Sequence, residues 1–132
     1  MLHRILAPRR TVHAHCDLPC GVYDPAQARI EAESVKACQE KYQGSEDPIF
    51  KERAISIKEE RADLVKHHLW VLWTDYFKPE HLEKHQNLHD LFWNATKEAG
   101  AAKKSQDPTQ GQRLLDAIAE IDKIFWETKQ PA

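Results

Sequence analysis

Residues 107–128, DPTQGQRLLDAIAEIDKIFWET, decide the class of fold. Their apolar side chains recur every three or four positions, which is the spacing of one face of an α-helix. An aspartate, Asp107, stands directly before Pro108 and can accept hydrogen bonds as an N-cap before a proline at the first helical position. The stretch therefore predicts an amphipathic helix from Pro108 to about Thr128. Its apolar side consists of Leu114, Leu115, Ile118, Ile121 and Phe125.

The same Asp-Pro signal occurs at residues 24–25 and 47–48. The first pair predicts a helix from about Pro25 to Tyr42, with Gly44 just past its end as a C-cap. The second pair predicts a long helix from Pro48 towards Tyr76 that stops before Pro79, because the residue before a proline avoids the helical region. Their predicted apolar sides are Ile30, Val35, Cys38 and Tyr42 for the first, and Phe50, Ile57, Leu64, Val71 and Leu72 for the second.

A further helix is predicted between about Asn87 and Ala101, followed by a polar connection over residues 100–107. Its inward residues are expected to be Leu88, Leu91, Phe92, Ala95 and Ala99. No segment alternates polar and apolar residues as a half-buried strand does. Four amphipathic helices with short connections predict an all-α fold, an antiparallel up-and-down four-helix bundle.

Length and composition limit the possible functions. The chain has 132 residues, 41% hydrophobic and 30% charged, which predicts one globular domain. A mean hydropathy of -0.70 and the lack of a long apolar run argue against a membrane span. The net charge is -2, and removal of residues 1–14, with three arginines and no acid, would take it to -5. Nucleic acid is therefore not an expected partner.

Residues 15–23, HCDLPCGVY, carry the chemistry. Cys16 and Cys20 stand close enough to bring two thiolates onto one metal ion. A cut between Ala14 and His15 would add a free α-amine and an imidazole beside the Cys16 amide nitrogen. Such a planar set with one axial nitrogen suits Ni(II) or Cu(II). A disulfide or a zinc site are the alternatives, but structural zinc needs a second ligand pair, and the sequence has no further cysteine pair.

This motif resembles the nickel hook of the nickel superoxide dismutases, His-Cys-x-x-Pro-Cys-Gly-x-Tyr, and matches it at every fixed position. The likeness continues through DP at 24–25, KHH at 66–68, DYFKP at 75–79 and IDKIFWET at 121–128. The resemblance implies disproportionation of superoxide by Ni(II)/Ni(III) cycling, with one nickel ion per subunit. It implies a homohexamer of four-helix bundles, each with an N-terminal metal-binding hook. The implied metal ligands are His15, Cys16 and Cys20, and Tyr23 belongs with them in the catalytic centre.

The resemblance also implies roles around the metal. Tyr76 would line the approach to nickel with Tyr23, and Glu31 would accept a hydrogen bond from the axial histidine while Arg61 supports Glu31. Asp17 and Lys78 would shape the field at the entrance. The residues alone suggest plainer roles: solvated charges for Glu31 and Arg61, packing for Tyr76, and for Lys78 a cation that complements a helix dipole.

Residues 1–14 are interpreted as a leader that is removed on maturation, which leaves 15–132 as the domain. Arg9 and Arg10 interrupt what apolar character the stretch has, so it is a poor secretory signal, although Val12-His13-Ala14 is a plausible cleavage end. While attached, it would hide the His15 amine. The resemblance implies that a dedicated peptidase removes it. Thiolate ligands favour the cytoplasm as compartment.

Three further expectations concern other residues. His81, His85 and His89 are spaced by four residues and are expected to share a helical face, more plausibly as surface or subunit-contact residues than as a second metal site. Cys38 is expected to be a small buried hydrophobic residue. The four tryptophans are expected to divide between the core and an oligomer interface.

The alternative to an enzyme is a non-enzymatic nickel or copper carrier with the same hook.

Overall fold

The computed structural model describes residues 20–130, and every regular element within them is helical. The elements are α2 (Ala26–Gln43), α3 (Pro48–Val71), the π turn η1 (Leu72–Tyr76), α4 (Pro79–Lys84), α5 (Leu88–Lys104) and α6 (Pro108–Thr128). The all-α prediction is confirmed. None of these helices is both long enough and apolar enough to cross a bilayer.

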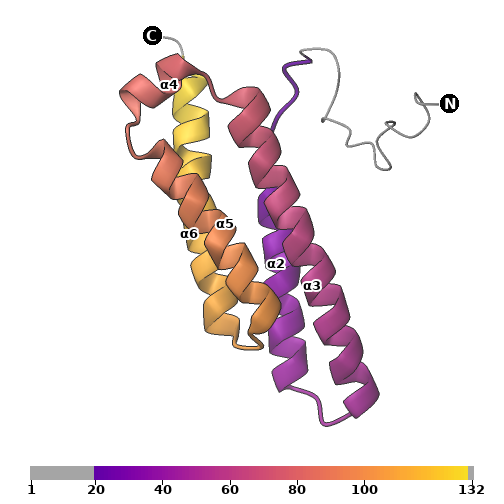
Figure 1. The fold of residues 1–132 in the computed structure, drawn as a ribbon. Helices are drawn as coiled ribbons and strands as arrows, with labels where there is room; N and C mark the ends of the chain where they lie inside the picture. The colour runs from indigo at the N-terminus through magenta and orange to yellow at the C-terminus, as the bar shows by residue number, and fades with distance from the viewer. Residues whose placement is uncertain (1–19, 131–132) are drawn as a thin grey trace, which may run out of the picture.

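The four long helices form an elongated antiparallel bundle (Figure 1). Helix α2 packs against α3 and α6, and α5 packs against the same two helices. The start of α2, the π turn, α4 and the end of α6 therefore meet at one end of the bundle, together with residues 20–24 (Figure 1). We call this the hook end. The predicted up-and-down four-helix bundle is confirmed.

The predicted inner faces of α5 and α6 are also confirmed. In each of these two helices the expected residues are buried, apart from one partly buried leucine, Leu91 in α5 and Leu115 in α6. The buried set is Leu88, Phe92, Ala95, Ala99, Leu114, Ile118, Ile121 and Phe125.

The predicted inner faces of α2 and α3 are confirmed only in part, with Cys38, Tyr42 and Leu64 partly buried. Ile30 is 52% exposed, and Phe50 and Ile57 are exposed as well. Val35, Val71 and Leu72 are buried as expected, but most inward positions hold alanines or polar residues. The buried residues of these helices include Ala28, Ala32, Gln39, Ala54, Lys58, Ala62, Val65 and Leu69. Small side chains allow two helices to approach closely, so the alanine faces turn inward while larger apolar residues remain outside.

A buried lysine helps to determine which face of α3 turns towards the core. Lys58 is fully buried, and its ammonium donates to the backbone oxygens of Lys103 and Ser105 at 3.0 and 2.7 Å and to Gln106 Oε1 at 2.9 Å. All three donors of the ammonium are thus used. Burial lowers the pKa of Lys58. This contact ties α3 to the end of α5, at the opposite end of the bundle from residues 20–24.

Two buried glutamines extend this polar cluster. Gln39 Nε2 donates to Ser105 O and to Gln110 Oε1, each at 3.2 Å. Gln110 in turn donates to the backbone oxygen of Glu98 at 2.7 Å. A Cβ at Gly111 would clash with Gln39 Oε1 and lie 2.9 Å from Lys36 Cβ and 3.0 Å from Lys36 Cα, so glycine is required for this approach of α6 to α2. Lys58, Gln39 and Gln110 form what we call the anchor end.

The region between α3 and α5 differs from the prediction in two ways. Helix α5 continues through Gly100 to Lys104, so the connection begins at Ser105 and not at residue 100. A short helix, α4, begins at Pro79 and ends at Lys84, and its C-cap His85 has a φ of -125° and a ψ of 78°, which are not helical. His81, His85 and His89 therefore lie on α4, on its C-cap and on α5, and the expected shared helical face does not form.

The end of the long helix is a π turn. Phe77 N donates to Leu72 O at 3.0 Å, five residues back, where an α-helix bonds four back. The wider turn brings Tyr76 against Phe125 of α6, with ring centroids 4.4 Å apart. Single π turns inside helices are frequent at functional sites.

Candidate active site

The structure describes part of the candidate site. His15, Cys16, Asp17 and the predicted leader lie outside the described residues. The candidate residues that it describes are Cys20, Tyr23, Glu31, Arg61, Tyr76 and Lys78.

Cys20 is exposed at the hook end. The backbone N–H of Val22 donates to its sulfur at 3.4 Å, a contact that suits a thiolate, the form of cysteine that binds metals. Between them Gly21 has a φ of +69°, which a residue with a Cβ adopts only with strain. The exposed sulfur beside this turn fits a metal ligand.

A pocket of about 460 Å³ lies beside this turn. It brings together residues from four segments of the chain: Gly21, Tyr23, Tyr76, Lys78, His81 and Thr128. Its charged lining consists of two cations, Lys78 and Lys129, and two acids, Asp75 and Glu80. The pocket therefore brings Gly21, the residue after Cys20, together with both candidate tyrosines and Lys78.

The two tyrosines face each other in this pocket. Their ring centroids are 5.6 Å apart and the rings are tilted by 54°. Tyr76 also lies against Phe125 and shares a hydrogen bond of 2.6 Å with the hydroxyl of Thr128. The Lys129 ammonium lies 4.9 Å from the centre of the Tyr76 ring. Tyr76 thus packs against the core and lines the pocket at the same time.

Glu31 and Arg61 form an ion pair between α2 and α3. Arg61 donates to both carboxylate oxygens of Glu31, at 3.2 and 3.4 Å. The Glu31 side chain is only 18% exposed, so it is not an ordinary solvated helix charge. By contrast, the nearby pair of Arg29 and Glu33 lies within one helix and is about half exposed. The structure brings together the two residues that the resemblance linked, while their role towards a metal stays a prediction.

His81 lines the pocket and was missed as a site residue. Its Nδ1 accepts a hydrogen bond of 3.0 Å from the backbone N–H of Lys78, and its ring stacks on Tyr76 at 5.8 Å. Burial lowers the pKa of His81, although the carboxylate of Glu80 opposes the shift. The proline two residues earlier is a helix-start signal that could have separated His81 from the other histidines. Thr128 lies in the matched stretch at 121–128, but nothing in the sequence connected it or Lys129 with Tyr76.

Metal ligands beyond Cys20 are not gathered in the described part. Within residues 20–130, no group of three or more histidine, cysteine, aspartate or glutamate side chains could hold a metal ion. His15 and Cys16, which are the candidate ligands that would bind the metal together with Cys20, precede residue 20 in the sequence.

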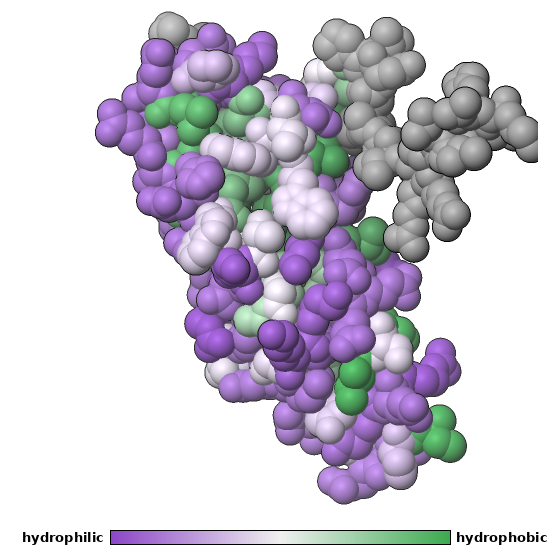
Figure 2. All heavy atoms as spheres, viewed as in Figure 1, coloured by the Kyte–Doolittle hydropathy of each residue, from purple (hydrophilic) through white to green (hydrophobic). Residues whose placement is uncertain are grey.

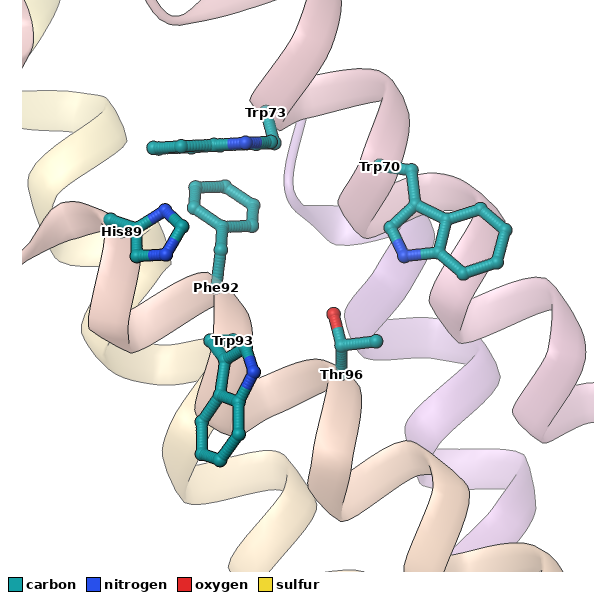
Figure 3. Close-up of a pocket in the computed structure, with 6 residues that line it drawn as sticks. All are labelled: Trp70, Trp73, His89, Phe92, Trp93 and Thr96. Atoms are coloured by element: carbon teal, nitrogen blue, oxygen red, sulfur yellow. The ribbon is translucent and has the colours of Figure 1, made fainter.

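A second, aromatic pocket of about 220 Å³ lies between α3 and α5 (Figure 3). Trp73 lies over Phe92, with ring centroids 5.0 Å apart, while Trp70 and Trp93 border the pocket from the two helices (Figure 3). His89 and Thr96 complete the lining. This lining has neither a carboxylate nor a thiolate, so it lacks the ligands that the candidate chemistry needs.

The bundle and the thiolate-bearing turn at its end point to a helical metalloprotein. Residues 10–129 match the model of the nickel-containing superoxide dismutases, and the chain belongs to that family. It is 65% identical over 130 residues to a superoxide dismutase [Ni] of Streptomyces coelicolor, covering 98% of this chain and 99% of the relative. A native nickel superoxide dismutase structure has 66% identity and a TM-score of 0.86, covering 89% of this chain and 100% of that chain.

Three solved variants of nickel superoxide dismutase are altered at a histidine, an aspartate and a tyrosine that are numbered first, third and ninth in those proteins. In this chain the same three residue types recur at that spacing from His15 alone, as His15, Asp17 and Tyr23.

Family membership decides between the alternatives that the sequence left open. Nickel is the cofactor, superoxide is the substrate, and the chain is an oxidoreductase and not a carrier.

Proposed function

We propose that this chain disproportionates superoxide at one nickel ion held by His15, Cys16 and Cys20, after residues 1–14 have been removed. Two superoxide ions and two protons give dioxygen and hydrogen peroxide. Nickel supplies the one-electron chemistry, alternating between Ni(II) and Ni(III), and anionic thiolate and amide donors favour the oxidised state. The observation that carries the proposal is the exposed Cys20, next to a pocket walled by Tyr23 and Tyr76.

Removal of the leader is supported by the numbering of the solved variants. A chain that begins at His15 has histidine, aspartate and tyrosine at its first, third and ninth positions. The native structure corresponds over its whole length to 89% of this chain, whereas the curated relative corresponds to 98%. The proposed cleavage, by a maturation peptidase, turns an amide nitrogen into an amine that can bind nickel.

The described residues have two tasks in this proposal. Tyr23 and Tyr76 narrow the approach and restrict entry to small anions. Lys78 and Lys129 balance Asp75 and Glu80 in the pocket lining, so an anion is repelled less at this end than by the rest of a body whose net charge is negative. Asp17, together with Lys78, shapes the electric field at the entrance.

Glu31 and Arg61 would orient the imidazole of His15. A carboxylate that accepts a hydrogen bond from a metal-bound histidine fixes the direction of the ring and raises its basicity. The two hydrogen bonds from Arg61 hold the Glu31 carboxylate in place for this task.

A homohexamer is supported by the exposed aromatic residues. Trp70, Trp93 and Trp126 are 51%, 56% and 47% exposed, an unusual amount of aromatic surface for a small domain. Figure 2 shows pale and green side chains gathering along the groove between α3 and α5, within a largely purple surface. Aromatic residues are enriched in subunit interfaces. The cytoplasm is the proposed compartment, since its reducing conditions keep both thiolates available.

The test compares the full-length chain with a chain that begins at His15. We expect nickel-dependent superoxide decay, followed by pulse radiolysis, only in the shorter protein, with nickel content measured by elemental analysis in both. Equal activity in an intact full-length chain would refute the proposed ligand set.

In His15→Ala, the amine, the Cys16 amide and both thiolates remain. Nickel should still bind at near-stoichiometric occupancy, while dismutation falls by orders of magnitude because the axial imidazole is lost. Full activity in the nickel-replete variant would remove the axial ligand from the mechanism.

A further inference from the structure

Tyr76 begins a short chain of hydrogen bonds that ends on the backbone of α6. Its hydroxyl lies 2.6 Å from Thr128 Oγ1, and either oxygen could be the donor in that contact taken alone. The same Thr128 oxygen lies 2.5 Å from the backbone oxygen of Phe125 and donates to it. Both contacts are partly buried.

The second contact decides the direction of the first. A threonine hydroxyl has one hydrogen, and a backbone carbonyl oxygen can only accept. The Thr128 hydrogen is therefore committed to Phe125, so the oxygen of Thr128 accepts from Tyr76. Hydrogen bonds in such a chain strengthen one another, which favours this direction further.

We infer that Thr128 is a positioning residue that fixes the polarity of the Tyr76 hydroxyl in the pocket. The phenol hydrogen points to Thr128, and the remaining lone pair of the phenol oxygen is left for the pocket. Tyr76 is thus an acceptor towards whatever enters. This inference rests on the proposed function, because it concerns the approach to the same nickel site.

Neighbouring groups hold the Tyr76 ring in place, so the remaining freedom of this side chain is the rotation of its hydroxyl hydrogen about the C–O bond. Phe125 packs on the ring at 4.4 Å, His81 stacks at 5.8 Å, and the Lys129 ammonium lies 4.9 Å from its centre. Removing the Thr128 hydroxyl would free the phenol hydrogen without removing these contacts.

The direction of this hydrogen bond has a chemical consequence. Superoxide is an anion without a hydrogen to donate, so an acceptor on the wall gives it no hydrogen bond. Hydrogen peroxide and water each carry O–H donors and can bind to that oxygen. Thr128 therefore keeps Tyr76 from retaining the anion and from acting as the first proton donor.

The test uses a matched pair, Thr128→Val, which has the same shape without the hydroxyl, and Thr128→Ser, which keeps the hydroxyl. Raman spectra of the full chain report the Fermi doublet of tyrosine. The intensity ratio of its higher-frequency band to its lower-frequency band is low when the phenol donates a hydrogen bond and high when the phenol accepts one. Subtracting the spectrum of Tyr76→Phe isolates Tyr76 from the other two tyrosines. We expect a low ratio in the parent chain and in Thr128→Ser, and a higher ratio in Thr128→Val.

A second measurement follows inhibition of the processed, nickel-loaded protein by azide, a small anion. A freed phenol can donate to the anion, and a hydrogen bond to a charged partner supports about tenfold tighter inhibition in Thr128→Val. Thr128→Ser should keep the parent inhibition constant, and the double variant with Tyr76→Phe should lose the gain. A disruption of packing alone would not tighten anion binding.

A high doublet ratio in the parent chain, or azide inhibition that is no tighter in Thr128→Val, would overturn the inference. The Raman measurement needs no nickel. A protein that shows the donor phenol but fails to dismutate superoxide would refute the proposed function and leave the role of Thr128 intact.

Discussion

The two ends of the bundle satisfy their polar groups in opposite ways. At the anchor end, Lys58 is buried and uses all three of its donors on oxygens of the chain. At the hook end, Cys20 is exposed, and a pocket of about 460 Å³ is lined by tyrosines and by charges of both signs. Among the buried polar side chains of the anchor end, Gln39 Oε1 is left without a partner, while Lys58 and Gln110 bond to oxygens of the chain. Buried hydrogen bonds of this kind specify how helices pack, whereas polar groups that face a pocket are available to a ligand.

The backbone differs between the ends in the same sense. The anchor end joins α5 to α6 by a short connection whose Asp107 caps α6 through Thr109 N at 2.9 Å. The hook end interrupts regular helix with a π turn and then with Phe77 in extended conformation. Departures from regular geometry are expected where function requires them. We therefore expect substitutions at the hook end to affect activity, and those at the anchor end to affect stability.

The largest effect is expected from Cys20→Ser. A serine hydroxyl is too weakly acidic and too hard to replace a thiolate, so nickel-dependent dismutation should fall to background. Cys38→Ser is the matched control, because Cys38 is half buried on α2 and burial raises the pKa of its thiol. Pulse radiolysis and the visible spectrum of planar Ni(II) measure both variants. If Cys38→Ser silenced the enzyme and Cys20→Ser did not, the ligand assignment would be wrong.

Lys58→Met should have the largest effect on stability. It leaves the partly buried oxygens Lys103 O and Gln106 Oε1 without the lysine donor, while Ser105 O keeps only Gln39. Acceptors left unsatisfied cost about 1–3 kcal/mol each, so we expect a loss of about 3 kcal/mol after relaxation. Urea unfolding measures it, with Lys123→Met on the exposed side of α6 as control. Activity per folded, nickel-loaded molecule should be unchanged, and a specific loss of activity would contradict the separation of the two ends.

How well the fold could be predicted differs between the helices for a physical reason. Helices α5 and α6 bury large apolar side chains at regular spacing, so their inner faces are visible in the sequence. Helices α2 and α3 meet through alanines and Lys58, and hydropathy alone assigns such positions to the solvent side. The apolar stripe of Ile30, Phe50 and Ile57 was therefore mistaken for the core.

The site was predictable only as far as a motif marked it. Cys20, Tyr23, Tyr76 and Lys78 lie in matched motifs, and the structure places them around one turn and one pocket. Thr128 lies in a matched motif too, but its contact with Tyr76 spans 52 positions and depends on a π turn that the sequence does not signal. His81 was hidden because regular spacing suggested a continuous helix where Pro79 and His85 bound a short one.

Glu31→Gln tests whether the ion pair between α2 and α3 serves the metal site. Losing the charge weakens its hold on the axial ring, and such supporting contacts typically account for about 10–100-fold in activity. Glu33→Gln removes the exposed pair with Arg29 on the same helix and should leave dismutation unchanged. Activity per bound nickel measures both variants. Equal losses would assign a generic electrostatic role to both acids.

The smallest expected effect concerns His81 and acid pH. Neutral His81 accepts a hydrogen bond from Lys78 N through Nδ1, and protonation would remove that acceptor. Burial lowers its pKa in the folded protein, while Lys78, Lys84 and His85 act in the same direction and Glu80 against it. As pH falls below about 6.5, the ordinary histidine value, the unfolded chain takes up this proton first. The free energy of unfolding should therefore decline from that pH downward, until the folded protein is also protonated.

His81→Asn keeps an acceptor near the position of Nδ1 but does not titrate, so it should flatten this decline. One proton accounts for at most about 1.4 kcal/mol per pH unit, which bounds the difference in slope between variant and parent. Urea unfolding between neutral and acid pH measures it, with the exposed His67→Asn on α3 as control. Because the amide lacks the ring that stacks on Tyr76, dismutation at neutral pH should fall modestly in His81→Asn and not in the control. If the free energy of unfolding of His81→Asn declined with falling pH as steeply as that of the parent, the bond between Lys78 and His81 would not be the cause of the decline.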